Sequence, residues 1–277
     1  MPTDMSLQYD RIGSWSIIKL EIIQKYALAY SEILSKQKKV NLHHVYVDAF
    51  AGPGKHRSGE TGEFVRGSPQ IALEINPPFK EYHFIDIDSD KVNELLLLTA
   101  QRPEAHVYYG DCNEILLNEV FPEINFENFR RGLCLLDPYG LHLKWEVMKT
   151  AGQMKSIDMF LNFPIADMNR NVLHRDPSRV SPSQIQRMNN YWGDESWREK
   201  AYITQNDMFG SEVLLKQGNE RIVSAFRDKL KDMAGFQHVP KPLPMRNSTR
   251  AIVYYLFFAS QKPVAAHIVS EIFDKYH

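Results

Sequence analysis

Val47-Asp48-Ala49-Phe50-Ala51-Gly52-Pro53-Gly54 is the stretch of sequence that decides the fold. The apolar run 45–47 predicts a strand that ends at Asp48, and a glycine turn follows directly. Gly52 and Gly54 allow the backbone to approach a ligand closely, because a side chain at either position would fill that space. Taken alone, such a turn also fits a tight structural loop, so its meaning depends on the rest of the chain.

Four further apolar runs resemble the first, since each is short, rich in β-branched or aromatic residues, and ends at a polar or acidic residue. They are residues 82–85, 107–109, 133–136 and 159–161, and helical patterns separate them at 68–75, 89–100, 113–120 and 143–154. Strands that alternate with helices predict an α/β, Rossmann-like fold with a mostly parallel sheet covered on both faces. Right-handed crossovers then place the five strand ends along one edge, where ligands bind in such sheets.

The segments outside this core predict additional helices. Apolar residues recur at helical spacing over 14–36, and residues 212–233 and 268–276 show similar patterns. An apolar strand over 251–259 is expected to pair with the segment around 237–243. The predicted organisation is an N-terminal helical segment (1–40), a cofactor-binding core (41–165), a helical insertion or lid (166–211) and a C-terminal completion of the core (212–277).

The amino-acid composition of the chain argues against several classes of function and of binding site. Lys and Arg number 33 against 34 Asp and Glu, so net charge gives no overall attraction to nucleic acid, although a local basic face remains compatible. Two cysteines are too few for a disulfide framework or a thiolate metal cluster, and the ten histidines show no ligand spacing, so no metal is expected. The absence of a long apolar run and of a signal-peptide pattern predicts a cytoplasmic protein without a membrane span.

Acidic residues at the ends of the second and third strands are candidate cofactor ligands. Asp86 and Asp88 could accept hydrogen bonds from the ribose hydroxyls of an adenosine, although Asp88 equally fits the start of a helix. Asp111 could accept from the adenine amino group while Cys112 packs against the ring, or Asp111 could simply cap the next helix. The predicted cofactor is S-adenosylmethionine, held by Asp48, Phe50, Gly52, Gly54, Asp86, Asp88, Asp111 and Cys112.

The ends of the fourth and fifth strands are candidates for the methyl acceptor site. In Leu136-Asp137-Pro138-Tyr139-Gly140, Asp137 could orient or deprotonate an amine or hydroxyl, and Tyr139 could stack on a planar substrate. An Asp-Pro-x-Gly sequence is also an ordinary turn. Asn162 and Phe163 could form part of the wall of the acceptor site, or they could simply begin a loop.

Two basic stretches lie outside these strand ends. Residues 55–67 carry Arg66 and are expected to form a loop, either one that contacts substrate or phosphate or a solvated one. The arginines of 170–187 could face a polyanion or be scattered surface charge. Motifs of α/β hydrolases and P-loop phosphotransferases are absent from the sequence, which argues against both classes.

Together these motifs resemble those of the three-Cys-motif partner proteins, called TcmP. The residues that carry the likeness are 48–54, Gly67-Ser68-Pro69, Phe84-Ile85-Asp86, Gly110-Asp111-Cys112-Asn113, 136–141 and Asn162-Phe163-Pro164, and it extends through 254–259. The resemblance implies a class I methyltransferase-like fold and a partner protein that carries the three cysteines, of radical-SAM type. It names an association and no reaction, so the acceptor stays open.

Two more distant likenesses concern nucleic acid. Residues 48–54 are similar to the cofactor turn of DNA cytosine methyltransferases, with Phe50 in place of the first glycine. Asp137-Pro138-Tyr139 is similar to the Asp-Pro-Pro-Tyr of amino-group DNA methyltransferases, which holds a flipped base, but the second proline is missing. A nucleic acid or nucleobase is therefore one expected acceptor.

Three other interpretations stay open at this point. The chain could be a non-catalytic module that holds a cofactor and supports its partner. It could instead be a nucleic-acid repair or modification factor, which would need a basic face. A dinucleotide oxidoreductase shares the same strand, glycine and acid pattern.

Overall fold

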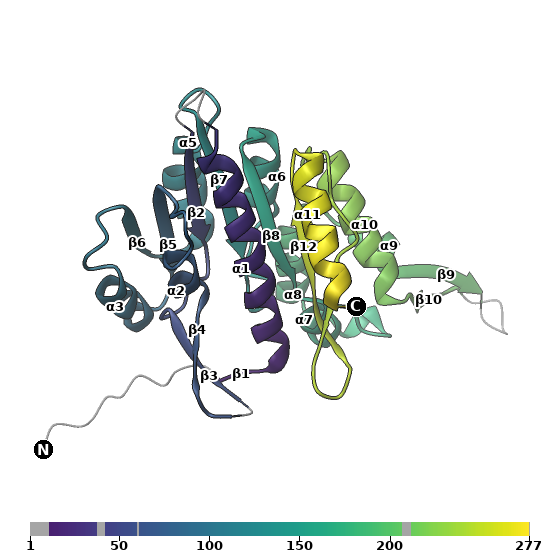
Figure 1. Cartoon of the computed structure of the whole chain (residues 1–277). Helices are drawn as coiled ribbons and strands as arrows, with labels where there is room; N and C mark the ends of the chain where they lie inside the picture. Colours follow the sequence, from purple (N-terminus) through teal and green to yellow (C-terminus); the bar gives the residue numbers. More distant parts are fainter. Residues whose placement is uncertain (1–10, 38–41, 60, 207–211, 277) are drawn as a thin grey trace, which may run out of the picture.

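The computed structural model describes residues 11–37, 42–59, 61–206 and 212–276. Within these ranges a seven-stranded sheet forms the centre of the molecule, in the order β11-β12-β8-β7-β2-β5-β6 (Figure 1). The strands are β2 (His43–Asp48), β5 (Glu81–Asp86), β6 (Ala105–Tyr109), β7 (Arg130–Leu136), β8 (Ile157–Phe163), β11 (Leu243–Arg246) and β12 (Ile252–Ala259).

Five of these strands run parallel. β2 lies between β5 and β7, with β6 outside β5 and β8 outside β7. β12 pairs antiparallel with β8, and β11 pairs antiparallel with β12. This mostly parallel sheet confirms the predicted α/β, Rossmann-like fold, and it places the carboxyl ends of the five strands along one edge.

Helices cover both faces of the sheet, and the two apolar layers follow from the alternation of side chains along the strands. Val45 and Val47 of β2 belong to one layer, while Tyr46 belongs to the other. α1 and α11 pack on the second layer, on the same face of the sheet, and contact each other (Figure 1). The helices are α1 (Ser14–Ser35), α2 (Ser68–Leu73), α3 (Ser89–Leu98), α4 (Cys112–Ile115), η1 (Leu116–Val120), α5 (Phe121–Glu123), α6 (Trp145–Met154), α7 (Ile165–Asn171), η2 (Pro177–Arg179), α8 (Pro182–Trp192), α9 (Trp197–Ala201), α10 (Asn219–Asp232), α11 (Pro263–Phe273) and η3 (Asp274–Tyr276).

The region after β8 differs from the prediction in two strands, β9 (Tyr202–Asn206) and β10 (Glu212–Lys216), which lie where helices were expected. The stretch from Glu212 does not start a helix: β10 pairs antiparallel with β9, and α10 begins only at Asn219. Residues 212–216 were included in the helical pattern predicted over 212–233, whereas their pairing depends on a segment that precedes them. The helix over 212–233 was therefore predicted too long.

Two other boundaries also shift. Residues 55–67 form a hairpin of β3 (Lys55–Ser58) and β4 (Phe64–Arg66) instead of the expected loop, and β1 (Arg11–Ile12) pairs with β3. The partner of β12 begins at Leu243, later than expected, and α11 begins before the predicted helix. Among the described residues, no helix combines the length and the apolar character that crossing a membrane requires.

Candidate cofactor and acceptor site

The turn after β2 has the conformation that its glycines permit. Gly52 has φ +63° and Gly54 has φ +81°, which side chains disfavour. The amide of Gly67 donates to the Gly54 carbonyl at 2.7 Å, and a β-carbon on Gly67 would lie 2.8 Å from the Gly54 backbone. The turn is therefore fastened to the start of α2, and the hairpin of β3 and β4 loops out between the two.

Asp86, at the end of β5, holds this turn from the neighbouring strand. Its Oδ2 accepts from the Gly52 amide at 2.8 Å, and its Oδ1 accepts from the Asp88 amide at 2.9 Å. Each carboxylate oxygen retains a further lone pair. One side chain thus orders two loops at the carboxyl edge of the sheet.

A cavity of about 410 Å³ opens at this edge. It collects six of the predicted site residues, from four segments of the chain: Phe50, Asp86, Asp88, Asp111, Cys112 and Tyr139. The other residues that line it, which the sequence interpretation missed, are Ala49, Ile87, Lys91, Gly110 and His142. Ile87 carried a usable signal, because it is an apolar residue between two acids at a strand end, and it is 72% exposed.

Asp88 and Asp111 act as helix caps and also line the cavity. The Asp88 carboxylate accepts from the amides of Asp90 and Lys91 and starts α3. Asp111 accepts from the amide and the side-chain nitrogen of Asn113 and starts α4. The capping and ligand interpretations of these residues are therefore compatible, since a carboxylate can accept several hydrogen bonds.

Cys112 is a buried part of the cavity wall. Burial raises the pKa of its thiol to about 12, so the thiol stays protonated and does not act as a nucleophile at neutral pH. Such a thiol packs as a small apolar group.

Asp48 lies beneath the turn and does not line the cavity. It is fully buried, and burial raises the pKa of its carboxyl to about 7. Its Oδ1 accepts from the Phe50 amide at 3.3 Å. The structure thus gives Asp48 a supporting contact with the turn, while Gly52 and Gly54 shape the turn itself.

Asp137, at the end of β7, belongs to a cluster of three polar side chains. Its Oδ2 forms an ion pair with the Nζ of Lys19, and its Oδ1 accepts from Asn162 Nδ2 at 2.8 Å. Lys19 comes from α1, and its side chain is only 9% exposed, against 24% for Asp137. Lys19 interrupts the apolar pattern of the first helix, but Lys25 does so too, so the sequence alone did not single out Lys19.

Three predicted acceptor residues have other positions. Phe163 is fully buried, and its ring packs 4.7 Å from that of Phe226, so the predicted role as a substrate wall was wrong for this side chain. Arg66 lies on β4 and forms an ion pair with Glu74 at 2.5 Å, outside the cavity. Pro138 is buried, whereas Tyr139 is 76% exposed at the rim, where Lys91 Nζ lies 5.7 Å from its ring centroid.

Comparison with known proteins bears on the fold. No protein-family model matches the chain, and no curated protein matches it in sequence. A Legionella pneumophila protein of the DUF519 family is similar in structure, with a TM-score of 0.53 and 12% identity over 93% of this chain and 92% of that chain. The likeness spans nearly all of both chains and shows a shared fold.

Proteins described as methyltransferases are more distant neighbours. One from Thermobifida fusca has a TM-score of 0.43 and 13% identity, over 90% of this chain and 82% of its own. One from Listeria monocytogenes, described as S-adenosylmethionine dependent, has a TM-score of 0.41 and 12% identity, over 85% of this chain and 99% of its own.

Proposed function

We propose that the chain is an S-adenosylmethionine-dependent methyltransferase that holds its cofactor in the cavity at the carboxyl edge of the sheet. The observation that carries the proposal is the meeting of three carboxylates with apolar and aromatic walls in this cavity. Asp86 and Asp111 suit ribose hydroxyls and an exocyclic amino group, since a carboxylate accepts hydrogen bonds from both. Phe50 and Ile87 offer apolar surface to a purine ring.

The charge of the cavity favours this cofactor over a dinucleotide. Asp86, Asp88 and Asp111 face one lysine, Lys91, so the local charge is negative. Negative charge repels the phosphates of NAD or ATP and attracts the positively charged sulfur and amino group of S-adenosylmethionine.

S-adenosylmethionine, when bound, would supply an activated methyl group on a sulfonium, which leaves a neutral thioether after transfer to a nucleophile. The contribution of this chain is to place the acceptor. Lys19 and Asn162 fix both oxygens of Asp137, so this carboxylate can orient an acceptor N–H or O–H without moving itself. The proton released by the acceptor would leave through Asp137 or solvent.

The position of Tyr139 favours a methyl acceptor that is planar. Its ring is exposed at the rim of the cavity, two residues after Asp137, and an exposed aromatic ring can stack on a base. We therefore propose a nucleobase or nucleic acid as acceptor. The resemblance to TcmP adds the proposal that a three-cysteine-motif protein of radical-SAM type acts together with this chain.

Calorimetric titration tests the cofactor. We expect S-adenosylmethionine and its demethylated product to bind, and NAD and ATP not to bind. Asp111→Asn keeps the helix-capping oxygen but removes the charge, so it should weaken cofactor binding about tenfold or more. Asp176→Asn is the matched control, because Asp176 also caps a helical turn, in the segment 177–179 outside the cavity.

The outcomes of this titration distinguish the alternatives. Equal weakening by the two variants, or tight binding of NAD, would contradict the assigned cavity. Binding of S-adenosylmethionine without methyl transfer to DNA, RNA or the partner would favour the non-catalytic module. If transfer occurs, Asp137→Asn should lower turnover while affinity for the cofactor is retained.

A further inference from the structure

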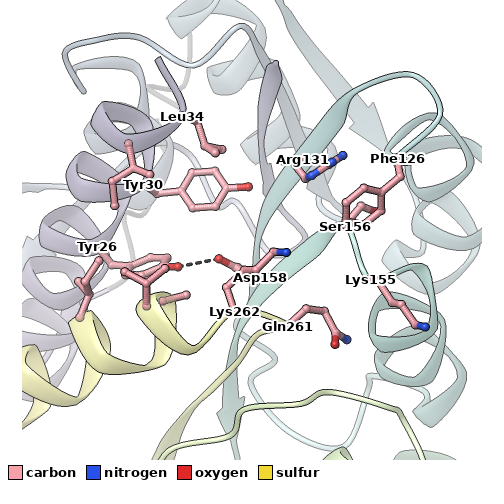
Figure 2. Close-up of a pocket in the computed structure, with 14 residues that line it drawn as sticks. Tyr26, Tyr30, Leu34, Phe126, Arg131, Lys155, Ser156, Asp158, Gln261 and Lys262 are labelled. Carbon is pink, nitrogen blue, oxygen red and sulfur yellow. Dashed lines mark hydrogen bonds between the residues drawn. The ribbon is translucent and has the colours of Figure 1, made fainter. Parts of the chain in front are cut away.

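A second cavity, of about 120 Å³, lies at the opposite edge of the sheet, where β7 and β8 begin (Figure 2). α1 and α11 form its apolar side through residues that include Tyr26, Leu34 and Ile268. Arg131 and Asp158, near the starts of the two strands, provide its polar side. The proposed methyltransferase site uses the other edge, so this cavity is a separate feature.

Tyr30 presents a hydroxyl group to the cavity without a partner. The residue is only 8% exposed, and its ring extends from α1 toward the strands (Figure 2). No hydrogen bond joins this hydroxyl to any residue in the described part of the chain, whereas the neighbouring Tyr26 donates to Asp158 at 2.6 Å. Burial raises the pKa of Tyr30 well above its ordinary value, so the group is a protonated donor. The hydroxyl opens onto the cavity, so a ligand bound there could accept its hydrogen bond.

Positive charge predominates around the cavity. Arg131, Lys155 and Lys262 line it, and none of the three forms an ion pair with a carboxylate among residues 11–37, 42–59, 61–206 and 212–276. Arg131 donates once, to the Arg130 carbonyl at 2.7 Å, and its guanidinium has five N–H donors. Lys155 and Lys262 are exposed at the rim.

Asp158 does not neutralise these cations at close range. Its two oxygens accept from the hydroxyls of Tyr26 and Ser260, at 2.6 Å and 2.5 Å. Burial raises the pKa of this carboxyl and so favours its neutral form. The cavity therefore combines an apolar wall, an excess of cations and an unused hydroxyl donor.

We propose that this cavity binds a small monocarboxylate whose apolar body is about the size of one aromatic ring. A cavity of about 150 Å³ accommodates benzene, and this one, at about 120 Å³, is somewhat smaller, so a ring would fill it with the carboxylate at the polar side, outside the enclosed space. The carboxylate would accept from the Tyr30 hydroxyl and the Arg131 guanidinium, and the ring would pack against Leu34 and Ile268.

Titration of the full chain with benzoate, followed by calorimetry and ligand-observed NMR, tests this proposal. Benzamide has the same shape without the charge, so benzoate should bind at least about tenfold more tightly. Tyr30→Phe removes only the hydroxyl and should weaken benzoate about tenfold or more. Tyr276→Phe removes a hydroxyl that bonds Lys25 and Glu21 outside the cavity, and it should leave the affinity unchanged.

Three results would overturn the proposal. They are no detectable binding of benzoate at millimolar concentration, equal binding of benzoate and benzamide, and unchanged affinity of Tyr30→Phe. Ala265→Leu fills the cavity from α11 and should abolish benzoate binding. Unfolding by urea, recorded for every variant, shows whether a loss of affinity reflects a loss of folded protein.

Discussion

Replacing Lys19 by methionine tests whether α1 fixes the carboxylate of Asp137, the group proposed to orient the acceptor. The substitution keeps most of the side-chain volume and removes the only charge that pairs with Asp137 among the described residues. Breaking a buried ion pair by removing one partner costs about 3 to 5 kcal/mol. The Asp137 side chain is 24% exposed and keeps its bond from Asn162, so we expect Lys19→Met to lower the free energy of unfolding by about 2 to 3 kcal/mol.

A double-mutant cycle isolates the pair. Asp137→Asn leaves Lys19 unpaired, whereas the double variant leaves no charge behind, so the two single losses should exceed the double loss by about 2 kcal/mol. Urea unfolding followed by circular dichroism measures all four proteins. Lys36→Met is the control, because Lys36 is an exposed cation near the end of α1 that lies 3.8 Å from Glu32, and its loss should cost less than about 1 kcal/mol.

The cycle has a clear negative result. A coupling below about 0.5 kcal/mol would show that Lys19 and Asp137 do not stabilise each other, since residues without interaction are additive within that range. The proposed placement of the acceptor by a fixed carboxylate would then lose its support. Equal losses for Lys19→Met and Lys36→Met would refute the same reasoning.

Three further predictions concern stability. Gly67→Ala puts a β-carbon 2.8 Å from the backbone of the glycine turn, so urea unfolding should show a loss of about 1 to 3 kcal/mol, and an unchanged midpoint would contradict this packing. Burial raises the pKa of Asp48 from 3.8 to about 7, so between these values the folded state binds a proton that the unfolded state does not, and the free energy of unfolding falls as pH rises. Asp48→Asn removes this titration and should reduce the fall between pH 5 and pH 7.5 by about 2 kcal/mol. The same dependence on pH in both proteins would contradict the prediction. Burial opposes ionisation of Glu81, but hydrogen bonds from His83 and Arg130 outweigh it and lower the pKa from 4.5 to about 2. The stability that this shift provides is present above pH 4.5 and is lost as pH falls toward 2. The melting temperature of Glu81→Gln should therefore fall less steeply with decreasing pH in this range than that of the original protein.

The central sheet could be predicted because its signal is local. β2 is buried along almost its whole length, as a strand covered on both faces must be, and a continuous apolar run marks such a strand directly. The acids at strand ends are equally local, so Asp86 and Asp111 were found at the cavity. Their double role as loop anchors or helix caps was harder to anticipate, because one carboxylate can serve the backbone and a ligand at once.

The missed features depend on contacts between distant segments. Lys19 reaches Asp137 only because α1 packs over the sheet, and nothing near Lys19 in sequence specifies that neighbour. The error at Phe163 was avoidable: successive residues of a strand point to opposite faces, so Asn162 and Phe163 could not both face an acceptor. The pairing of β10 with β9 lacked a local signal, because residues 212–216 were included in the helical pattern predicted over 212–233 and their partner strand lies in another segment.

α1 imposes an order on folding. Lys19 contacts a residue 118 positions later, Tyr26 one 132 positions later, and the Trp15 carbonyl accepts from Tyr254, 239 positions away. Contacts of such long range form slowly, because the intervening chain must first be brought together. During synthesis this helix therefore emerges well before β12 exists, and its apolar face stays uncovered until the sheet is nearly complete. We expect the docking of α1 to be among the last events of folding, and its exposed face to be where a chaperone would bind the nascent chain.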